Sequence, residues 1–193
     1  MSALPKSPFP PALAFILDNP LRRLLINRDR YLRDMGVVEG CRILEVGCGP
    51  GFFTEALSIV TGKDGVVYAQ DVEKRMLERL ERKLKSFRFQ NVIPLLCNSS
   101  ALDLPSASCD IVFCANVFEE IYKEGEMEGT VREITRVLKA SGILVIKEHR
   151  PGGTRRKIEA VEDMFINLGY NKVFERKTIL SYNSKLRRPP ERG

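Results

Sequence analysis

The sequence predicts an α/β protein built on a doubly wound, mostly parallel sheet, with helices on both faces and an antiparallel strand near the C-terminus. From residue 41 onward, short apolar runs rich in β-branched residues alternate with longer stretches of helical period. Glycine, proline, aspartate or asparagine marks each change between the two kinds of segment. Such alternation implies parallel strands joined by right-handed crossovers, which place helices on both faces.

Five strands and three helices make up the alternating region. The predicted strands are Arg42–Val46, Val66–Gln70, Val92–Cys97, Ile111–Cys114 and Ile143–Lys147. The predicted helices between them are Phe52–Val60, Glu73–Phe87 and Gly129–Ala140. The second helix has apolar residues at spacings of three and four, which is the period of a helix with one buried face: Met76, Leu77, Leu80 and Leu84.

The region after the fifth strand predicts one more helix and two more strands. The helix covers Arg155–Leu168, where apolar residues recur at helical spacing and Gly169 supplies a C-terminal stop. The segments Lys172–Lys177 and Thr178–Ser184 have no helix between them, so we expect them to form an antiparallel pair. With this pair the sheet would have seven strands.

Residues 1–36 precede the first strand and are predicted to form a helical cap on a domain that covers residues 37–193. Prolines keep the first eleven residues irregular. Helices are predicted over Ala12–Leu17 and Leu21–Met35. They are separated near Asn19-Pro20, because the residue before a proline is disfavoured in a helix.

The positive charge of the chain is concentrated at its two ends. Residues 1–36 carry six Lys and Arg against three acids, and residues 147–193 carry twelve against six. Residues 37–146 carry thirteen basic and sixteen acidic residues and are mildly acidic. The basic ends are consistent with an anionic substrate or a nucleic-acid surface, although an ordinary solvated charged face is the commoner explanation.

The cysteines predict neither a zinc site nor a disulfide framework, and no metal is expected. The five thiols, at positions 41, 48, 97, 109 and 114, include no Cys-x-x-Cys pair, and His149 is the single histidine. Free cysteines favour a reducing, cytoplasmic compartment. The apolar segment 9–17 contains two prolines, is too short to span a membrane and lacks a cleavage site, so no membrane insertion is expected.

A glycine-rich turn joins the first strand to the following helix. Gly47, Gly49 and Gly51 allow a sharp turn and let a ligand approach the main chain, because no Cβ intrudes. The dinucleotide fingerprint would place its third glycine at position 52, which holds Phe52. No Gly-Lys-Ser/Thr follows either, so the turn departs from the phosphate loop of nucleotide hydrolases.

Two acidic residues beside this turn indicate the charge of the ligand. Asp71 ends the second strand, 20 residues after Gly51, where a ribose-binding carboxylate is expected. Glu45 ends the first strand just before the turn. A negative charge there is unfavourable for a pyrophosphate but suits an ammonium or sulfonium group. Charge therefore favours S-adenosylmethionine over a nicotinamide dinucleotide.

At these residues the chain resembles the class I S-adenosylmethionine-dependent methyltransferases, in their small-molecule, type 11-like branch. The matching segments are 45-EVGCGPG-51, 68-YAQD-71 and 98-NSSALDLPSASCDIVFCANVFEEI-121. The resemblance is close over residues 37–150 and weaker toward the C-terminus. It implies a Rossmann-like sheet, S-adenosylmethionine as cofactor and S-adenosylhomocysteine as product.

The resemblance also implies roles for individual residues. The glycines would lie along the methionine portion and the ribose, with Cys48 in the same loop as a residue whose thiol is incidental. Glu45 would contact the amino group, directly or through water, and Asp71 the ribose hydroxyls. The adenine would lie against Val72 and near the segment after the third strand. In that segment the family's usual Gly-Asp is replaced by Ser99 and Ser100, and Asn98 could substitute. Asn116, after the fourth strand, would lie near the methionine tail.

Two residues are candidates for a catalytic base. Glu120, in the pair Glu119-Glu120, could accept a proton or bind a cationic substrate, although acids at a helix N-terminus also stabilise the helix dipole. His149 ends the fifth strand, at the rim where such sheets bind ligands, and has both a catalytic and a structural interpretation. Methyl transfer asks mainly for proximity and alignment, because the sulfonium is already activated.

The sequence thus predicts in-line methyl transfer to a small-molecule acceptor by a cytoplasmic enzyme, either a monomer or a homodimer. Residues 1–36 would be the lid, with Phe9, Phe15 and Tyr31 available to cover the substrate. One alternative is an RNA or protein methyltransferase that uses the basic ends; the Asn/Asp-Pro-Pro-Tyr/Phe stretch of base-methylating enzymes is replaced here by residues 115–118. Another is a non-catalytic regulator that binds S-adenosylmethionine.

Overall fold

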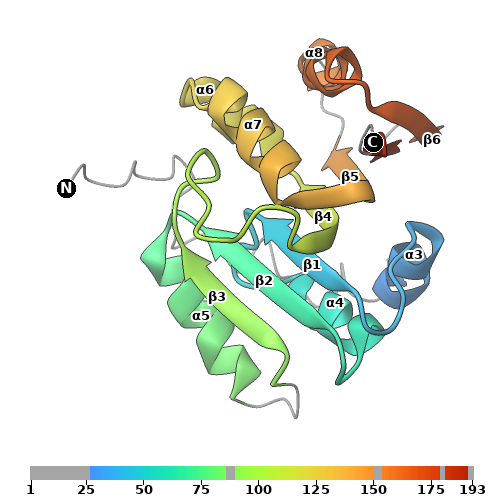
Figure 1. Ribbon diagram of the computed structural model, residues 1–193. Helices are drawn as coiled ribbons and strands as arrows, with labels where there is room; N and C mark the ends of the chain where they lie inside the picture. Colours follow the sequence, from blue (N-terminus) through green and yellow to red (C-terminus); the bar gives the residue numbers. More distant parts are fainter. Residues whose placement is uncertain (1–26, 86–89, 150–153, 179–180, 191–193) are drawn as a thin grey trace. The chain divides into compact units, whose positions relative to one another are not determined.

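The computed structural model describes residues 27–85, 90–149, 154–178 and 181–190 (Figure 1). The chain folds as two compact units, Met1–Asn98 and Ser99–Gly193, which are described separately below. The predicted helix Ala12–Leu17 lies outside the described residues, as do Phe9 and Phe15 of the predicted lid.

The first unit contains three parallel strands in the order β3-β2-β1. These are β1 (Arg42–Val46), β2 (Val66–Asp71) and β3 (Val92–Leu96), and all three lie where the sequence predicts strands. Helices α4 (Thr54–Thr61) and α5 (Lys74–Leu84) make the two crossovers, and both pack against these strands (Figure 1).

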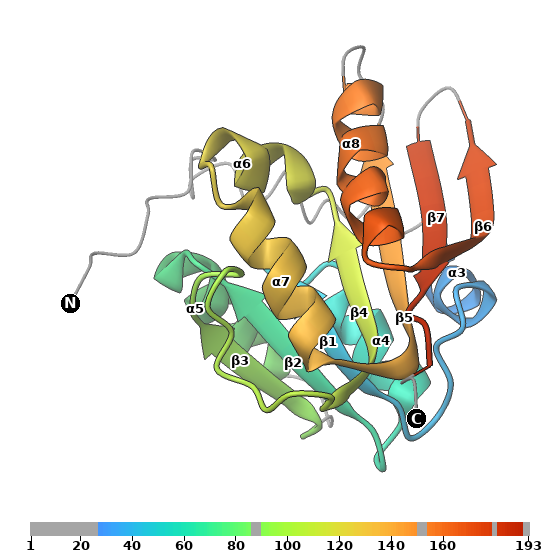
Figure 2. The same cartoon turned by 45° about the horizontal axis from the view of Figure 1, so that its top comes forward.

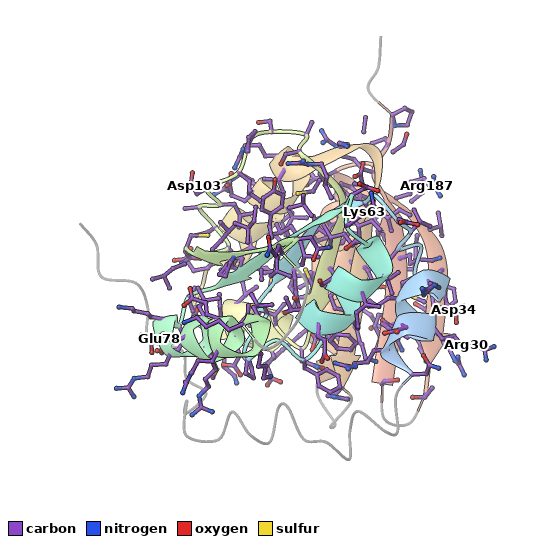
Figure 3. All side chains as sticks on the ribbon, turned by 90° about the horizontal axis from the view of Figure 1, so that it is seen from below. Arg30, Asp34, Lys63, Glu78, Asp103 and Arg187 are labelled. Atoms are coloured by element: carbon purple, nitrogen blue, oxygen red, sulfur yellow. The ribbon has the colours of Figure 1, made fainter. Side chains whose placement is uncertain are left out.

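The apolar stripe predicted on the second helix is the buried face of α5. Met76, Leu77 and Leu80 are buried, whereas Glu78 is exposed and points away from the strands (Figure 3). The helix begins after Glu73, whose side chain accepts a hydrogen bond from the Arg75 main-chain N–H at 3.4 Å. Burial of one stripe therefore sets how α5 lies on the strands.

A short helix before β1 is anchored to the start of α4. Helix α3 (Arg28–Asp34) is the described part of the predicted helix Leu21–Met35. The Arg28 guanidinium lies 5.1 Å from the Phe52 ring centroid, donates to the Phe52 main-chain oxygen and reaches Glu55 at 3.4 Å. Tyr31 packs against Phe53, with ring centroids 6.1 Å apart. These contacts fasten α3 to the segment that follows the glycine turn.

The second unit contains four strands in the order β4-β5-β7-β6. Strands β4 (Cys109–Ala115) and β5 (Leu138–His149) are parallel, and β7 (Ser181–Arg187) pairs antiparallel with both β5 and β6 (Asn171–Lys177). The predicted antiparallel pair at the C-terminus is therefore confirmed. Helices α6 (Phe118–Lys123), α7 (Met127–Val137) and α8 (Thr154–Asn167) lie on one face of these strands (Figure 2).

Several predicted boundaries in this unit are displaced, and the largest difference is at β5, which begins at Leu138 and not at the predicted Ile143. The predicted helix Gly129–Ala140 ends at Val137, because Leu138 is extended and pairs with Cys109 of β4. The last predicted strand, Thr178–Ser184, is described from Ser181 and continues to Arg187, and Thr178 exchanges main-chain and side-chain hydrogen bonds with Ser181. The pairing of Leu138 with Cys109, which is far away in the sequence, thus overrides the local helical pattern.

A buried polar cluster joins α8 to the C-terminal strands. Glu162 of α8 is 1% exposed and accepts hydrogen bonds from Lys172 Nζ at 2.6 Å, from Tyr182 Oη at 2.8 Å and from Ser184 Oγ. Glu175 adds a second carboxylate, 3.1 Å from Lys172 Nζ and 2.8 Å from Tyr182 Oη. The carboxylate of Glu162 is thus satisfied by three donors from β6 and β7, as a buried charge requires.

Glu162→Ala should destabilise the protein by about 1–3 kcal/mol, because the substitution removes the buried acceptor of Ser184 Oγ and leaves Lys172 and Tyr182 with Glu175 alone. Urea denaturation of the full chain measures this change in the free energy of unfolding. The matched control is Glu128→Ala, since Glu128 pairs with Arg132 at 4.0 Å and its side chain is 83% exposed. The control should change stability by less than about 0.5 kcal/mol. Equal effects of the two substitutions would contradict the assignment.

Candidate active site

The glycine turn between β1 and α4 adopts the conformation that its sequence requires. Gly49 and Gly51 have φ angles of +53° and +86°, in the left-handed region that favours glycine. A Cβ at Gly51 would lie 2.5 Å from Leu80 Cδ1, so this glycine is needed where the turn packs against α5. A Cβ at Gly49 would meet no described atom within 4 Å. Within the part of the chain that the structure describes, the space beside the Gly49 main chain is therefore open.

The end of β2 holds the turn in place through side-chain acceptors. The Gly49 N–H donates to Asp71 Oδ2 at 2.8 Å, and the Gly47 N–H donates to Gln70 Oε1 at 3.2 Å. The other oxygen of Asp71 accepts from the Glu73 N–H at 2.9 Å. Asp71 is 8% exposed, and burial raises the pKa of its carboxyl group even though these N–H donors oppose the shift. Each carboxylate oxygen has a second lone pair, which leaves acceptor capacity for ribose hydroxyls.

Glu45 places a second carboxylate beneath the same turn. Its side chain is 3% exposed, and Oε2 accepts a hydrogen bond from Thr54 Oγ1 at 2.6 Å. Burial raises the pKa of Glu45 to about 8, and the nearby charge of Asp71 adds to the shift while the Thr54 hydrogen bond opposes it. A cation bound near Glu45 would favour its ionised form.

Neither carboxylate has a cationic partner in the part of the chain that the structure describes. Buried carboxylates are usually paired with a cation or protonated. A ligand with an ammonium or sulfonium group would supply the missing charge, and its hydroxyls could bond to Asp71. The residues present therefore fit S-adenosylmethionine, on the charge and donor chemistry of this unit alone.

Cys48 and Val72 are both among the predicted cofactor-binding residues, but their surroundings differ. Cys48 is 5% exposed and packs in an apolar cluster with Ala69, Leu77 and Leu80, where burial raises the pKa of its thiol. Its side chain therefore supports the turn from below. Val72 is half-buried in the bend between β2 and α5, directly after Asp71.

The predicted adenine segment begins in the first unit and ends in the second. Asn98 is half-buried and follows Cys97, whose carbonyl accepts from Gln70 Nε2 at 2.5 Å. Ser99 is buried and its Oγ lies 2.7 Å from Thr130 Oγ1 of α7, so its hydroxyl is engaged within the second unit. A Cβ at Gly129 would lie 2.7 Å from the Ser100 Cβ, which shows how tightly this turn sits on α7.

The ends of β4 and β5 are joined by a compact set of hydrogen bonds around Asn116. This residue has a φ of +56°; its N–H donates to the Lys147 oxygen and its Oδ1 accepts from the His149 N–H, both at 2.8 Å. Glu148, 3% exposed, accepts from the Val117 and Phe118 N–H groups at 3.0 and 3.1 Å. Burial raises the pKa of Glu148 to about 7, although the hydrogen bonds from these two N–H groups lower it.

The two predicted base candidates both lie in the second unit and differ in their surroundings. Glu120, in the first turn of α6, is bound through Oε1 to Lys123 Nζ at 2.9 Å, and its side chain is 37% exposed. Glu119 lies 3.7 Å from Lys123 Nζ and 3.9 Å from Lys157 Nζ. His149 is exposed at the end of β5. Its main chain is fixed by Asn116, while its ring is on the surface of this unit.

Three residues that position the candidate site were absent from the predicted set: Gln70, Thr54 and Glu148. A partial signal existed for two of them. Gln70 is a polar residue inside an apolar strand, and Glu148 follows Lys147 at the end of another apolar run, so each interrupts the pattern of a buried strand. Thr54 gives no such signal, because threonine is a common residue at the start of a helix. Their partners lie 9 to 31 residues away.

Glu45→Gln should change how stability depends on pH. The folded-state pKa of about 8 lies above the ordinary value of 4.5, so the folded protein binds a proton that the unfolded chain has released between these values. Wild-type stability therefore falls as pH rises from about 4.5 to 8 through this group. The glutamine variant lacks this loss and should gain stability relative to wild type with rising pH. Denaturation at pH 5, 7 and 9 measures the difference in the free energy of unfolding between variant and wild type, with Glu128→Gln as an exposed control. A difference that is the same at all three pH values would contradict the prediction.

Comparison with known proteins agrees with this geometry. A family model described as a methyltransferase domain matches residues 44–146. Demethylmenaquinone methyltransferases of Geobacillus stearothermophilus and Staphylococcus aureus (strain MRSA252) are 32% and 33% identical over 127 and 121 residues, covering 66% and 63% of this chain. The matches cover 53% and 48% of those proteins, so the chain spans about half the length of these curated relatives.

Solved structures resemble the chain over most of its length. A SAM-dependent methyltransferase from Aquifex aeolicus has a TM-score of 0.82 at 25% identity and covers 93% of this chain and 98% of its own. A Haloferax volcanii putative methyltransferase, solved in complex with the Trm112 activator, has a TM-score of 0.74 at 16% identity and shows the fold alone. These likenesses confirm the predicted fold class. The chain belongs to the methyltransferase domain family, among the class I S-adenosylmethionine-dependent methyltransferases.

Proposed function

We propose that this chain transfers a methyl group from S-adenosylmethionine to a small-molecule acceptor. The observation that carries the proposal is the pair of buried carboxylates, Glu45 and Asp71, set around a glycine turn whose main chain is open at Gly49. Such a site attracts a ligand that combines a positive charge with hydroxyl donors. Membership of the methyltransferase domain family supports S-adenosylmethionine as that ligand.

The predicted cofactor-binding residues of the first unit each have a distinct part in binding the ligand. The Gly47–Gly51 turn accommodates the methionine portion against its main chain, and Asp71 accepts hydrogen bonds from the ribose hydroxyls. Glu45 stabilises the positive end of the ligand, directly or through water, when it is ionised. Val72 and Asn98 follow β2 and β3, where the resemblance puts the adenine. S-adenosylmethionine supplies an activated methyl group that the acceptor takes up by in-line displacement, leaving S-adenosylhomocysteine.

The contribution of the chain to catalysis is mainly orientation. Fixing two reactants in line can lower a barrier by about 7–11 kcal/mol without a covalent step on the protein. The turn after β4 is held by the hydrogen bonds of Asn116 to the end of β5 and by those that Glu148 accepts from the Val117 and Phe118 N–H groups. His149 and Glu120 remain the candidates to take a proton from the acceptor. The proposed lid is residues 1–36, and its described helix α3 is fixed to Phe52 and Phe53.

A small-molecule acceptor is favoured over a nucleic acid by the state of the basic C-terminal residues. A phosphate-binding surface needs cations that are available to phosphates. Most of the described lysines of this region already lie against acids or aromatic rings of the second unit: Lys157 on Glu119 and Tyr122, Lys172 on Glu162, Lys177 on Glu175 and Lys185 on Phe174. No helix among the described residues has the length and apolar character needed to cross a membrane.

Asp71→Ala should weaken S-adenosylmethionine binding by about 100-fold, because it removes the acceptor for the ribose and releases the Gly49 N–H. Titration calorimetry with S-adenosylmethionine and S-adenosylhomocysteine measures both affinities. Asp64→Ala is the matched control, since Asp64 pairs with Lys63 and is largely exposed. If the wild type binds S-adenosylmethionine and Asp71→Ala binds it with the same affinity, the assignment of Asp71 to the ribose is wrong.

Transfer is tested separately with S-adenosylmethionine carrying a labelled methyl group. Demethylmenaquinone is the first acceptor to assay, because the curated relatives are named for it. Label in an organic extract supports the small-molecule acceptor, whereas label in RNA or protein would establish the alternative. Binding without transfer to any fraction would favour a regulator that has lost catalysis.

A further inference from the structure

A buried amide at the end of β2 connects the segments that follow both neighbouring strands. Gln70 is 2% exposed. Its Oε1 accepts from the Gly47 N–H at 3.2 Å, its Nε2 donates to the Cys97 oxygen at 2.5 Å, and its main-chain oxygen accepts from the Cys48 N–H at 2.9 Å. One residue therefore ties the glycine turn after β1 to the chain that leaves β3.

The two partners require a side chain that both accepts and donates. Gly47 presents an N–H and Cys97 presents a carbonyl, so the amide oxygen must face Gly47 and the amide nitrogen must face Cys97. A glutamate could accept from Gly47 but, when ionised, would set an oxygen against the Cys97 carbonyl. A methionine of similar size would make neither bond. Glutamine thus matches the two partners chemically as well as in reach.

We infer that Gln70 is a positioning residue that fixes the glycine turn relative to the Cys97–Asn98 segment, so that both ends of one cofactor molecule are held together. The inference rests on the proposed function, because the turn and Asn98 are there assigned to the methionine portion and the adenine. Gln70 itself is buried beneath the turn and acts through Gly47 and Cys97. Its loss should therefore act on cofactor affinity.

The opposite end of these strands provides a matched comparison. Asn91, just before β3, donates through Nδ2 to the Ser58 oxygen at 3.2 Å, to Thr61 Oγ1 at 3.1 Å and to the Gly62 oxygen at 2.8 Å. It is likewise an amide that cross-links β3 to a neighbouring element. It lies at the amino end of the strand, away from the glycine turn. Its removal should cost stability and leave cofactor affinity unchanged.

Gln70→Met should raise the Kd for S-adenosylhomocysteine and the KM for S-adenosylmethionine by about 10- to 100-fold, the range expected when a buried donor and acceptor lose their partners. The turnover number at saturating cofactor should stay within about threefold of wild type, because the interaction acts before the chemical step. Asn91→Leu should lower the midpoint of thermal unfolding and leave Kd and KM within about twofold.

Gln70→Glu gives a second, conservative measurement that does not depend on the methionine variant folding. A protonated carboxyl group can donate to the Cys97 oxygen and accept from the Gly47 N–H, whereas an ionised one can only accept. The Kd of this variant, divided by that of wild type at the same pH, should therefore rise with pH, because only the protonated carboxyl group can replace both bonds of the glutamine.

The calorimetric titrations are run on full-length wild type, Gln70→Met, Gln70→Glu and Asn91→Leu, each with its unfolding midpoint measured. Weakened binding in the Gln70 variants with unchanged binding in Asn91→Leu supports the inference. Kd values that stay at the wild-type level in both Gln70→Met and Gln70→Glu, or equal losses of affinity in Gln70→Met and Asn91→Leu, overturn it while wild-type binding still supports the proposed function. A wild type that binds neither S-adenosylmethionine nor S-adenosylhomocysteine overturns both.

Discussion

The hydrogen bonds from the glycine turn to the end of β2 are the constraint on which the candidate site depends. A turn with several left-handed residues points its N–H groups away from the regular ladder, and each one that is buried must find an acceptor. Gln70 and Asp71 supply acceptors to Gly47 and Gly49 from adjacent positions on one strand. The turn can leave the space beside Gly49 open because these two acceptors hold its main chain from beneath.

The same arrangement destabilises the folded protein as long as no ligand is bound. Burial raises the pKa of both Glu45 and Asp71, so the charge that suits a cationic ligand is unfavourable in its absence. A ligand that supplies positive charge and binds only the folded state stabilises that state by mass action. Part of the stability of the protein in the cell is thus expected to come from its cofactor.

Much of the fold was predictable from sequence, because it follows from periodicity. The strands of the first unit, the buried stripe of α5 and the antiparallel pair at the C-terminus all follow from local patterns. The exceptions have long-range causes: the pairing of Leu138 with Cys109 ends α7, and no pattern in residues 127–140 alone contains that pairing. Glu45, Asp71 and the glycines were identifiable because their spacing is itself local.

The positioning residues were less predictable, because each is defined by a partner far away in the chain. Thr54 matters only because Glu45 is buried beside it, and Glu148 only because the N–H groups at the start of α6 point at it. Sequence reasoning finds groups that carry charge or chemistry; it does not find the groups that satisfy them. For methyl transfer this difference is large, since the reaction depends on alignment more than on any single reactive side chain. The residues that shape the candidate site of the first unit are therefore better sought among such partners, Thr54 and Gln70 first, than among candidate bases.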